Sequence, residues 1–188
     1  NMTYKEVRRL DAGSWYSDEY KGEKVPGLRE VLELAQGKIK LNIELKPADN
    51  GEELARKTVA LIEKYNMEND CVITSFSSSA LSAAKSCDEN IRVGYILSAA
   101  YGDYYDMKNI DFFSVNAAFL SKRTIDAIHN SGKQVYAWTV NNKDSIKNLT
   151  NKGVDGVITD NPVLARETIY SRDTSETIVN MIRYVFNQ

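Results

Sequence analysis

Two charged residues stand two positions apart at the end of a strand-like segment. In residues 39–46 the odd positions are apolar and the even positions, which include Glu44 and Lys46, are polar. Side chains alternate along a strand, so Glu44 and Lys46 share one face. The carboxylate can ligate a hard divalent cation, and the ammonium can bind a phosphate oxygen beside it. The alternative is an amphipathic edge strand with a solvated Lys–Glu ion pair, which contributes little to stability.

Two aromatic residues also end strand-like segments. Phe76 closes the apolar run 71–76, and Trp138 lies in the strand-like run 133–139. Each could form an apolar wall for a substrate or be a core aromatic. Ser75, beside Phe76, has the same two interpretations.

Other residues of chemical interest favour structural roles. His129 is the only histidine and precedes Gly132 near the end of a predicted helix, where a solvated or helix-terminal imidazole is expected. Asp160 comes just before Asn161-Pro162, a pattern typical of a helix cap. Cys71 and Cys87 are predicted to be buried fillers. The sequence contains no phosphate-binding glycine loop and no Gly-x-Ser-x-Gly motif, so nucleotide binding is unsupported and a serine triad would need His129.

Strand-like and helix-like periods alternate from residue 26 onward, which is typical of βα units around a parallel sheet. Apolar stripes predict the buried helix faces, for example Leu54, Thr58, Leu61, Ile62 and Tyr65 in residues 52–65, and Ile178, Met181, Ile182 and Val185 in a last docking helix. Ser121 and either Asn141 or Asn142 are predicted helix caps. The predicted strands are 39–46, 71–76, 92–97, 111–116, 133–139 and 154–159.

Such units can form an open doubly wound sheet or a closed barrel. A strand covered by helices on both faces is usually apolar throughout. The polar face of residues 39–46 instead favours the inside of a barrel near its carboxyl-terminal mouth, where active sites of that fold lie. No linker divides the chain, so residues 1–188 are expected to form a single domain.

Composition narrows the function classes. The 188 residues carry 24 basic and 26 acidic side chains and are 43% hydrophobic. The near-neutral charge argues against nucleic acid as a partner. Two cysteines are too few for a disulfide framework, and no apolar stretch is long enough to span a bilayer. The chain is expected to be soluble as written.

Four segments are similar, in order and spacing, to the glycerophosphodiester phosphodiesterases. They are residues 42–46 (NIELK), 72–76 (VITSF), 135–141 (VYAWTVN) and 153–162 (GVDGVITDNP), preceded by the similar segments 10–15 (LDAGSW) and 25–32 (VPGLREVL). The resemblance covers residues 3–169. The matching segments are most similar to those of a bacterial branch whose catalytic domain follows a membrane-embedded region. This similarity points to a membrane-associated parent protein.

This resemblance implies a (β/α)₈ barrel that hydrolyses glycerophosphodiesters to an alcohol and glycerol 3-phosphate with Ca²⁺ or Mg²⁺. Glu44 would be a catalytic residue and metal ligand, Lys46 a catalytic residue and phosphate partner, and Phe76 and Trp138 substrate-binding residues. The metal would polarise a phosphoryl oxygen, and Lys46 would help neutralise the charge of the transition state.

The chain also departs from the family pattern. The family's first two strands carry a His-Arg-Gly segment, a Glu-x-Asp pair and a second histidine, and none of these occurs here. A complete barrel needs about 250 residues, or about 30 per unit, so 188 residues match an incomplete barrel of six βα units without the first two. We therefore expect the family's hydrolase function but no turnover by this chain, and weak or absent metal binding. The alternatives are a non-catalytic shortened barrel that acts as a binding or assembly module, and a phosphodiesterase of the phosphatidylinositol-cleaving kind.

An incomplete barrel leaves two sheet edges unpaired, at residues 39–46 and 154–159. Their free backbone groups invite pairing with another strand. We expect either a homodimer through these edges or coverage of the gap by the first 25 residues.

Overall fold

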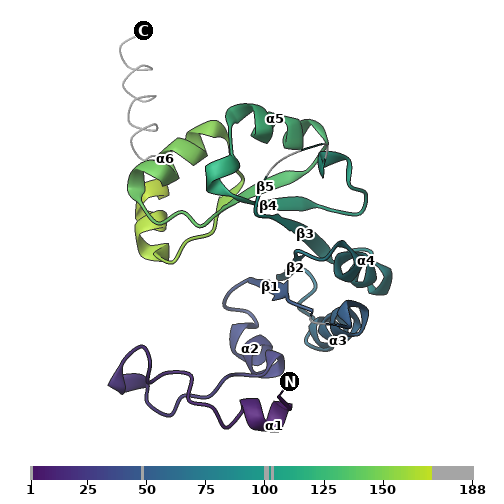
Figure 1. The fold of residues 1–188 in the computed structure, drawn as a ribbon, viewed down its shortest axis with the longest axis vertical. Helices are drawn as coiled ribbons and strands as arrows, with labels where there is room; N and C mark the ends of the chain where they lie inside the picture. Colours follow the sequence, from purple (N-terminus) through teal and green to yellow (C-terminus); the bar gives the residue numbers. More distant parts are fainter. Residues whose placement is uncertain (1, 48, 100–101, 103, 171–188) are drawn as a thin grey trace.

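A computed structural model describes residues 2–47, 49–99, 102 and 104–170. Six parallel strands form one sheet, and their order in the sheet is their order in the sequence. The sheet curls into a half-barrel, with α3 to α6 on its convex side (Figure 1). The strands are β1 (Leu41–Leu45), β2 (Cys71–Ser75), β3 (Arg92–Leu97), β4 (Phe112–Asn116), β5 (Gln134–Trp138) and β6 (Gly156–Val157). The predicted incomplete α/β barrel is confirmed, with six parallel strands.

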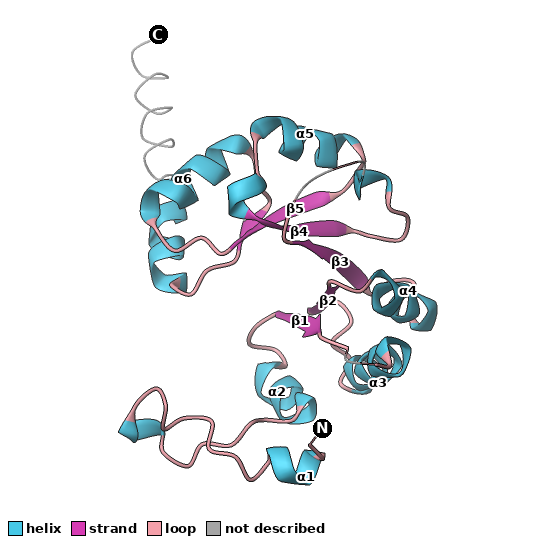
Figure 2. Ribbon diagram, in the orientation of Figure 1, coloured by secondary structure: helices cyan, strands magenta, loops and turns pink. Residues whose placement is uncertain are grey.

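Helices connect most of the strands (Figure 2). The link from β3 to β4 is the exception, because its described residues contain only a short 3₁₀ turn. The predicted docking helix around Met181 lies outside the described residues. The α-helices are α1 (Tyr4–Val7), α2 (Leu28–Ala35), α3 (Gly51–Lys64), α4 (Ser78–Cys87), α5 (Lys122–Asn130) and α6 (Lys143–Lys152), the 3₁₀ helices are η1 (Asp18–Tyr20), η2 (Tyr104–Asp106) and η3 (Ala117–Phe119), and residues 162–170 are also helical.

Helix ends follow the predicted capping residues. The Ser121 side chain accepts a hydrogen bond from the Thr124 amide at the start of α5, and Asn142 caps α6 in the same way. Gly153 ends α6 with a φ of 95°, a left-handed conformation that glycine adopts without steric cost. The Asn161 side chain accepts from the amide of Leu164 and so caps the helix at residues 162–170.

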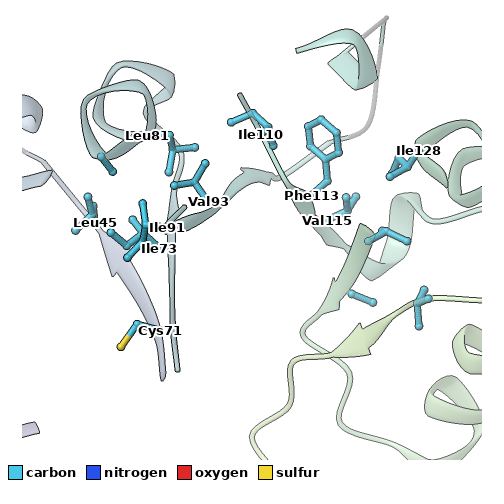
Figure 3. Close-up of a cluster of buried hydrophobic side chains, with 14 of the residues drawn as sticks. Leu45, Cys71, Ile73, Leu81, Ile91, Val93, Ile110, Phe113, Val115 and Ile128 are labelled. Atoms are coloured by element: carbon cyan, nitrogen blue, oxygen red, sulfur yellow. The ribbon is translucent and has the colours of Figure 1, made fainter. Parts of the chain in front are cut away.

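The hydrophobic core lies between the convex face of the sheet and the helices. Figure 3 shows Ile73, Val93, Phe113 and Val115, which alternate strand positions direct outward toward helix residues such as Leu81 and Ile128. The remaining strand positions therefore face the concave side of the half-barrel. No helix among the described residues is long and apolar enough to cross a membrane.

Three details differ from the sequence-based expectations. In α3 the buried stripe runs through Ala55, Thr58, Val59 and Ile62, whereas Leu54 is 37% exposed. Cys71 is buried as predicted, but Cys87 is exposed because it ends α4. Strand β6 is Gly156–Val157 and thus shorter than the predicted 154–159, and the Thr159 hydroxyl and the Asp160 amide beyond it donate to the side chain of Asn141.

The sheet ends at β1 on one side and at β6 on the other. Residues 2–25 lie beside α2: the Arg8 guanidinium donates to the Val25 carbonyl and to the Glu30 carboxylate. Within the described part of the chain, no backbone hydrogen bond joins residues 2–25 to either edge strand. The N-terminal segment thus leaves the two edges uncovered.

Candidate active site

Strand alternation on β1 directs its polar side chains into the concavity. Leu45 is buried in the core, so its neighbour Glu44 points the opposite way, together with Asn42. Lys46 follows the last residue of the strand. The carboxyl ends of parallel strands meet at one edge of the sheet, so these residues lie at the mouth where α/β barrels place their active sites.

All four residues proposed from the sequence line one cavity of about 350 Å³ at this mouth. Glu44 and Lys46 come from β1 and the loop after it, Phe76 follows β2, and Trp138 ends β5. The cavity therefore spans nearly the whole width of the sheet. Its lining is Asn42, Glu44, Lys46, Thr74, Phe76, Ile96, Ser114, Trp138, Thr139 and Ile158.

The charged side of the cavity consists of Glu44 and Lys46. The Lys46 Nζ lies 3.7 Å from Glu44 Oε2, and the two side chains are 77% and 34% exposed. An ion pair this exposed contributes little to stability, so Lys46 can turn to an anionic ligand at small cost. A flexible ammonium is well suited to a phosphate oxygen.

Two aromatic residues also line the cavity. Phe76 and Trp138 pack edge to face, with ring centroids 6.4 Å apart. The Trp138 indole N–H donates to the Ser114 carbonyl over 2.9 Å, so its one polar atom is satisfied inside the barrel. The peptide bond between Trp138 and Thr139 is cis. Both aromatic residues line the cavity rather than filling the core.

Other polar residues that line the cavity were not proposed from the sequence as site residues. Thr74 donates to the Asn42 side-chain oxygen over 2.9 Å, and the Ser114 residue lies deeper on β4. Thr74 is two positions before Phe76, so strand alternation alone would have placed it on the same face. Ser75, which the sequence left ambiguous, is fully buried and donates to the Leu45 carbonyl, so it joins β2 to β1.

The other candidates lie elsewhere. His129 Nε2 is 2.9 Å from Asp155 Oδ2, and that same oxygen accepts the Val135 backbone amide at the amino end of β5. His129 does not line the cavity. Asp160 accepts from the Asn141 side chain, so it ties two loops together. The cap expected before Pro162 is provided by Asn161 rather than by Asp160, whereas His129 lies in the last turn of α5 as expected.

The donor set of the cavity does not complete a divalent cation site. Ca²⁺ takes six to eight oxygen ligands, and Mg²⁺ near-octahedral coordination that includes carboxylates. Among the residues that line this cavity, Glu44 is the one carboxylate. The described residues contain no group of three or more His, Cys, Asp or Glu able to hold a metal ion.

The fold and the cavity define a class: a parallel α/β half-barrel with a polar and aromatic site at the carboxyl ends of its strands. The sequence profile described as the glycerophosphoryl diester phosphodiesterase family matches residues 1–164. The chain belongs to this family.

Relatives and solved structures agree with that membership. A glycerophosphodiester phosphodiesterase of Caldanaerobacter subterraneus is 27% identical, over 97% of this chain and 72% of the relative. The structure of an Oleispira antarctica phosphodiesterase in complex with the product sn-glycerol-3-phosphate is 29% identical, with a TM-score of 0.77 over 89% of this chain and 70% of that one. A Parabacteroides distasonis glycerophosphodiester phosphodiesterase, 21% identical, shares the fold with a TM-score of 0.81, covering 92% of this chain and 73% of that one.

Proposed function

We propose that this chain carries the phosphate-binding and alcohol-binding walls of a glycerophosphodiester phosphodiesterase site. The observation behind the proposal is the single cavity that joins Glu44 and Lys46 to Phe76 and Trp138 in a member of this family. Lys46 would bind the phosphate oxygens, and the aromatic pair would hold the carbon skeleton. Glu44 would provide one carboxylate ligand to a divalent cation.

We also propose that the 188-residue chain alone does not hydrolyse such diesters. A general acid and a general base each contribute typically about 10²–10⁴ in rate. The sole histidine, His129, is paired with Asp155 outside the cavity, and Glu44 and Lys46 are the ionisable groups that line it. This placement also favours the second candidate function, a binding module without turnover.

Binding and turnover are tested separately. Titration with sn-glycerol 3-phosphate should quench or shift the Trp138 emission, and Lys46→Ala should weaken the binding. Lys40→Ala is a matched control, because Lys40 is 80% exposed and does not line this cavity. Absence of any binding by the unmodified chain would refute the proposed site.

The turnover assay follows release of glycerol 3-phosphate from glycerophosphocholine with Ca²⁺ or Mg²⁺. We expect a rate equal to that of the metal-containing buffer. Metal-dependent release that Glu44→Gln abolishes would refute the inactivity and leave the binding site intact. Binding without turnover of any glycerophosphodiester, in a chain extended by the missing family segments, would favour the non-catalytic module.

Metal binding by the chain alone should be weak. One carboxylate with neutral oxygens is expected to hold Ca²⁺ or Mg²⁺ with a dissociation constant above about 1 mM. Isothermal titration checks this value, with Glu44→Gln as the control. Tight binding that Glu44→Gln removes would show that the cavity holds a more complete donor set than the one described.

For the partners, we propose a homodimer formed through the edges of β1 and β6. Support comes from their positions as the two terminal strands of the sheet, which leaves backbone donors and acceptors on their outer sides. Light scattering across a dilution series should show a dimer that dissociates. A monomer at all concentrations would contradict this proposal.

A further inference from the structure

Two loops at the rim of the cavity are tied together by the side chain of Asn141. Its Oδ1 accepts the Thr159 hydroxyl over 3.0 Å and the Asp160 backbone amide over 2.9 Å. Its Nδ2 donates to Asp160 Oδ2 over 2.7 Å. The Thr159 hydroxyl in turn accepts from the Asn161 amide over 3.0 Å, which links the network to the cap of the helix at 162–170.

These bonds lie next to the part of the chain that forms the aromatic side of the cavity. Trp138 and Thr139 line the cavity and stand three and two residues before Asn141, respectively. Ile158, which also lines it, immediately precedes Thr159. The end of β5 is thus anchored by the Trp138 indole to Ser114, and the loop that follows is anchored by Asn141 to the β6 loop.

We propose that Asn141 is a positioning residue that holds Trp138 in place as the wall of the binding cavity. It acts through the loop that directly follows Trp138 at the end of β5 and does not itself line the cavity. Without its three hydrogen bonds the loop after β5 is attached to the β6 loop by the backbone bond from the Val140 amide to the Ile158 carbonyl, and the indole gains freedom to move.

The position requires an amide, because one side chain must both accept and donate. An aspartate at 141 would keep the two acceptor bonds but would face the Asp160 carboxylate across the contact that is now a hydrogen bond of 2.7 Å. Two carboxylates at that distance repel each other and neither can donate. Asn141→Asp is therefore a nearly isosteric change that breaks the hydrogen bond between the side chains of residues 141 and 160.

The chain provides a matched control at the next residue. Asn142 caps α6 by accepting from the Ser145 amide, and aspartate caps as well as asparagine. Asn142→Asp adds the same charge at almost the same place and leaves the hydrogen bonds of Asn141 to Thr159 and Asp160 intact. The optical probe is also available, because Trp15 and Trp138 are the two tryptophans and Trp15→Phe leaves Trp138 as the single indole.

In the Trp15→Phe protein, Asn141→Asp should shift the Trp138 emission to longer wavelength and make it more readily quenched by acrylamide, with the far-ultraviolet circular dichroism unchanged. Asn142→Asp should change neither property. The affinity for sn-glycerol 3-phosphate should fall about tenfold with Asn141→Asp, the equivalent of one or two lost hydrogen bonds. An unchanged Trp138 emission, or an equal change in both variants, would overturn the proposal.

Exchanging the two partners makes the test stricter. Asn141→Asp combined with Asp160→Asn restores one donor opposite one acceptor and returns the net charge to its original value, so the Trp138 emission should recover. Failure to recover would overturn the proposal. If Asn141→Asp does not fold, Thr159→Val serves instead, because it removes one hydrogen bond to Asn141 Oδ1. It should shift the Trp138 emission in the same direction by a smaller amount. An unshifted emission would overturn the proposal. The Trp138 emission test does not depend on the proposed function. The proposed function fails only if the unmodified chain binds no glycerol 3-phosphate.

Discussion

Gly94 on β3 is a position where a single methyl group should destabilise the fold strongly. A Cβ built there would meet the Phe112 ring at 2.1–2.6 Å, far inside van der Waals contact. Phe112 is fully buried and packs on Tyr136, with ring centroids 4.7 Å apart. The Arg92 guanidinium also lies over the Phe112 ring, with its Cζ 5.7 Å from the ring centroid. These neighbours limit how far the Phe112 ring can move to relieve the clash.

Gly94→Ala should cost about 3 kcal/mol of unfolding free energy, the upper end of the range for overpacked cores. Alanine in an unstrained backbone would otherwise stabilise by about 0.4–1 kcal/mol through the unfolded state, so the sign of the effect depends on the clash. For a chain of this size the loss corresponds to a fall in Tm of about 6–12 °C. Urea unfolding followed by circular dichroism measures the free energy directly.

Two variants test whether the Phe112 ring is the cause. Gly156→Ala is the control, because its Cβ would approach the Tyr136 ring only to 3.2 Å, so a shift of a few tenths of an ångström relieves it. Gly94→Ala combined with Phe112→Leu should cost less than the sum of the single changes, by more than about 1 kcal/mol. Additive costs, or a stable Gly94→Ala protein, would refute the packing argument.

Two further predictions concern a thiol and a carboxylate. Burial raises the pKa of the Cys71 thiol to about 11, so a thiol reagent near neutral pH should modify only the exposed Cys87 until denaturant is added. Because this folded pKa exceeds the usual 9.0, stability should be lost as the pH rises from about 9 to 11; a flat profile would contradict it. Asp155→Ala removes the acceptor of the Val135 amide and should cost about 1–3 kcal/mol in urea unfolding, whereas Asp144→Ala, on exposed α6 surface, should cost much less.

Local sequence patterns predicted most elements because their causes are local. Caps such as Ser121 and Asn142 bond amides three residues away, and strand alternation needs only the residues on one strand. The same alternation placed Glu44 and Lys46 together before any tertiary information was available. The predicted α3 stripe is correct at Thr58 and Ile62 but wrong at Leu54, because tertiary packing of α3 on α4 decides where the edge of the buried face falls.

The residues that sequence reasoning missed are connected by tertiary contacts. The side chain of Asn141 bonds residues 18 and 19 positions away, and nothing in residues 139–142 distinguishes it from the cap Asn142 beside it. Thr74 and Asn42 are 32 residues apart. Such pairs depend on which strands are neighbours in the sheet and on the register between them. The alternation of polar and apolar residues along one strand determines neither the neighbouring strand nor the register.

The two sides of the cavity differ in how firmly the fold holds them. Trp138 lies on β5, which has a strand neighbour on each side, and its indole is bonded to Ser114. Glu44 lies on β1, whose one strand neighbour in the described sheet is β2, and Lys46 lies beyond the strand end with most of its side chain in solvent. Trp138 is thus held in place before a ligand binds, whereas Glu44 and Lys46 must be ordered when a ligand binds. Ligand affinity should therefore respond more to a partner strand at the edge of β1 than to one at the edge of β6, because ordering Glu44 and Lys46 is the larger remaining entropic cost.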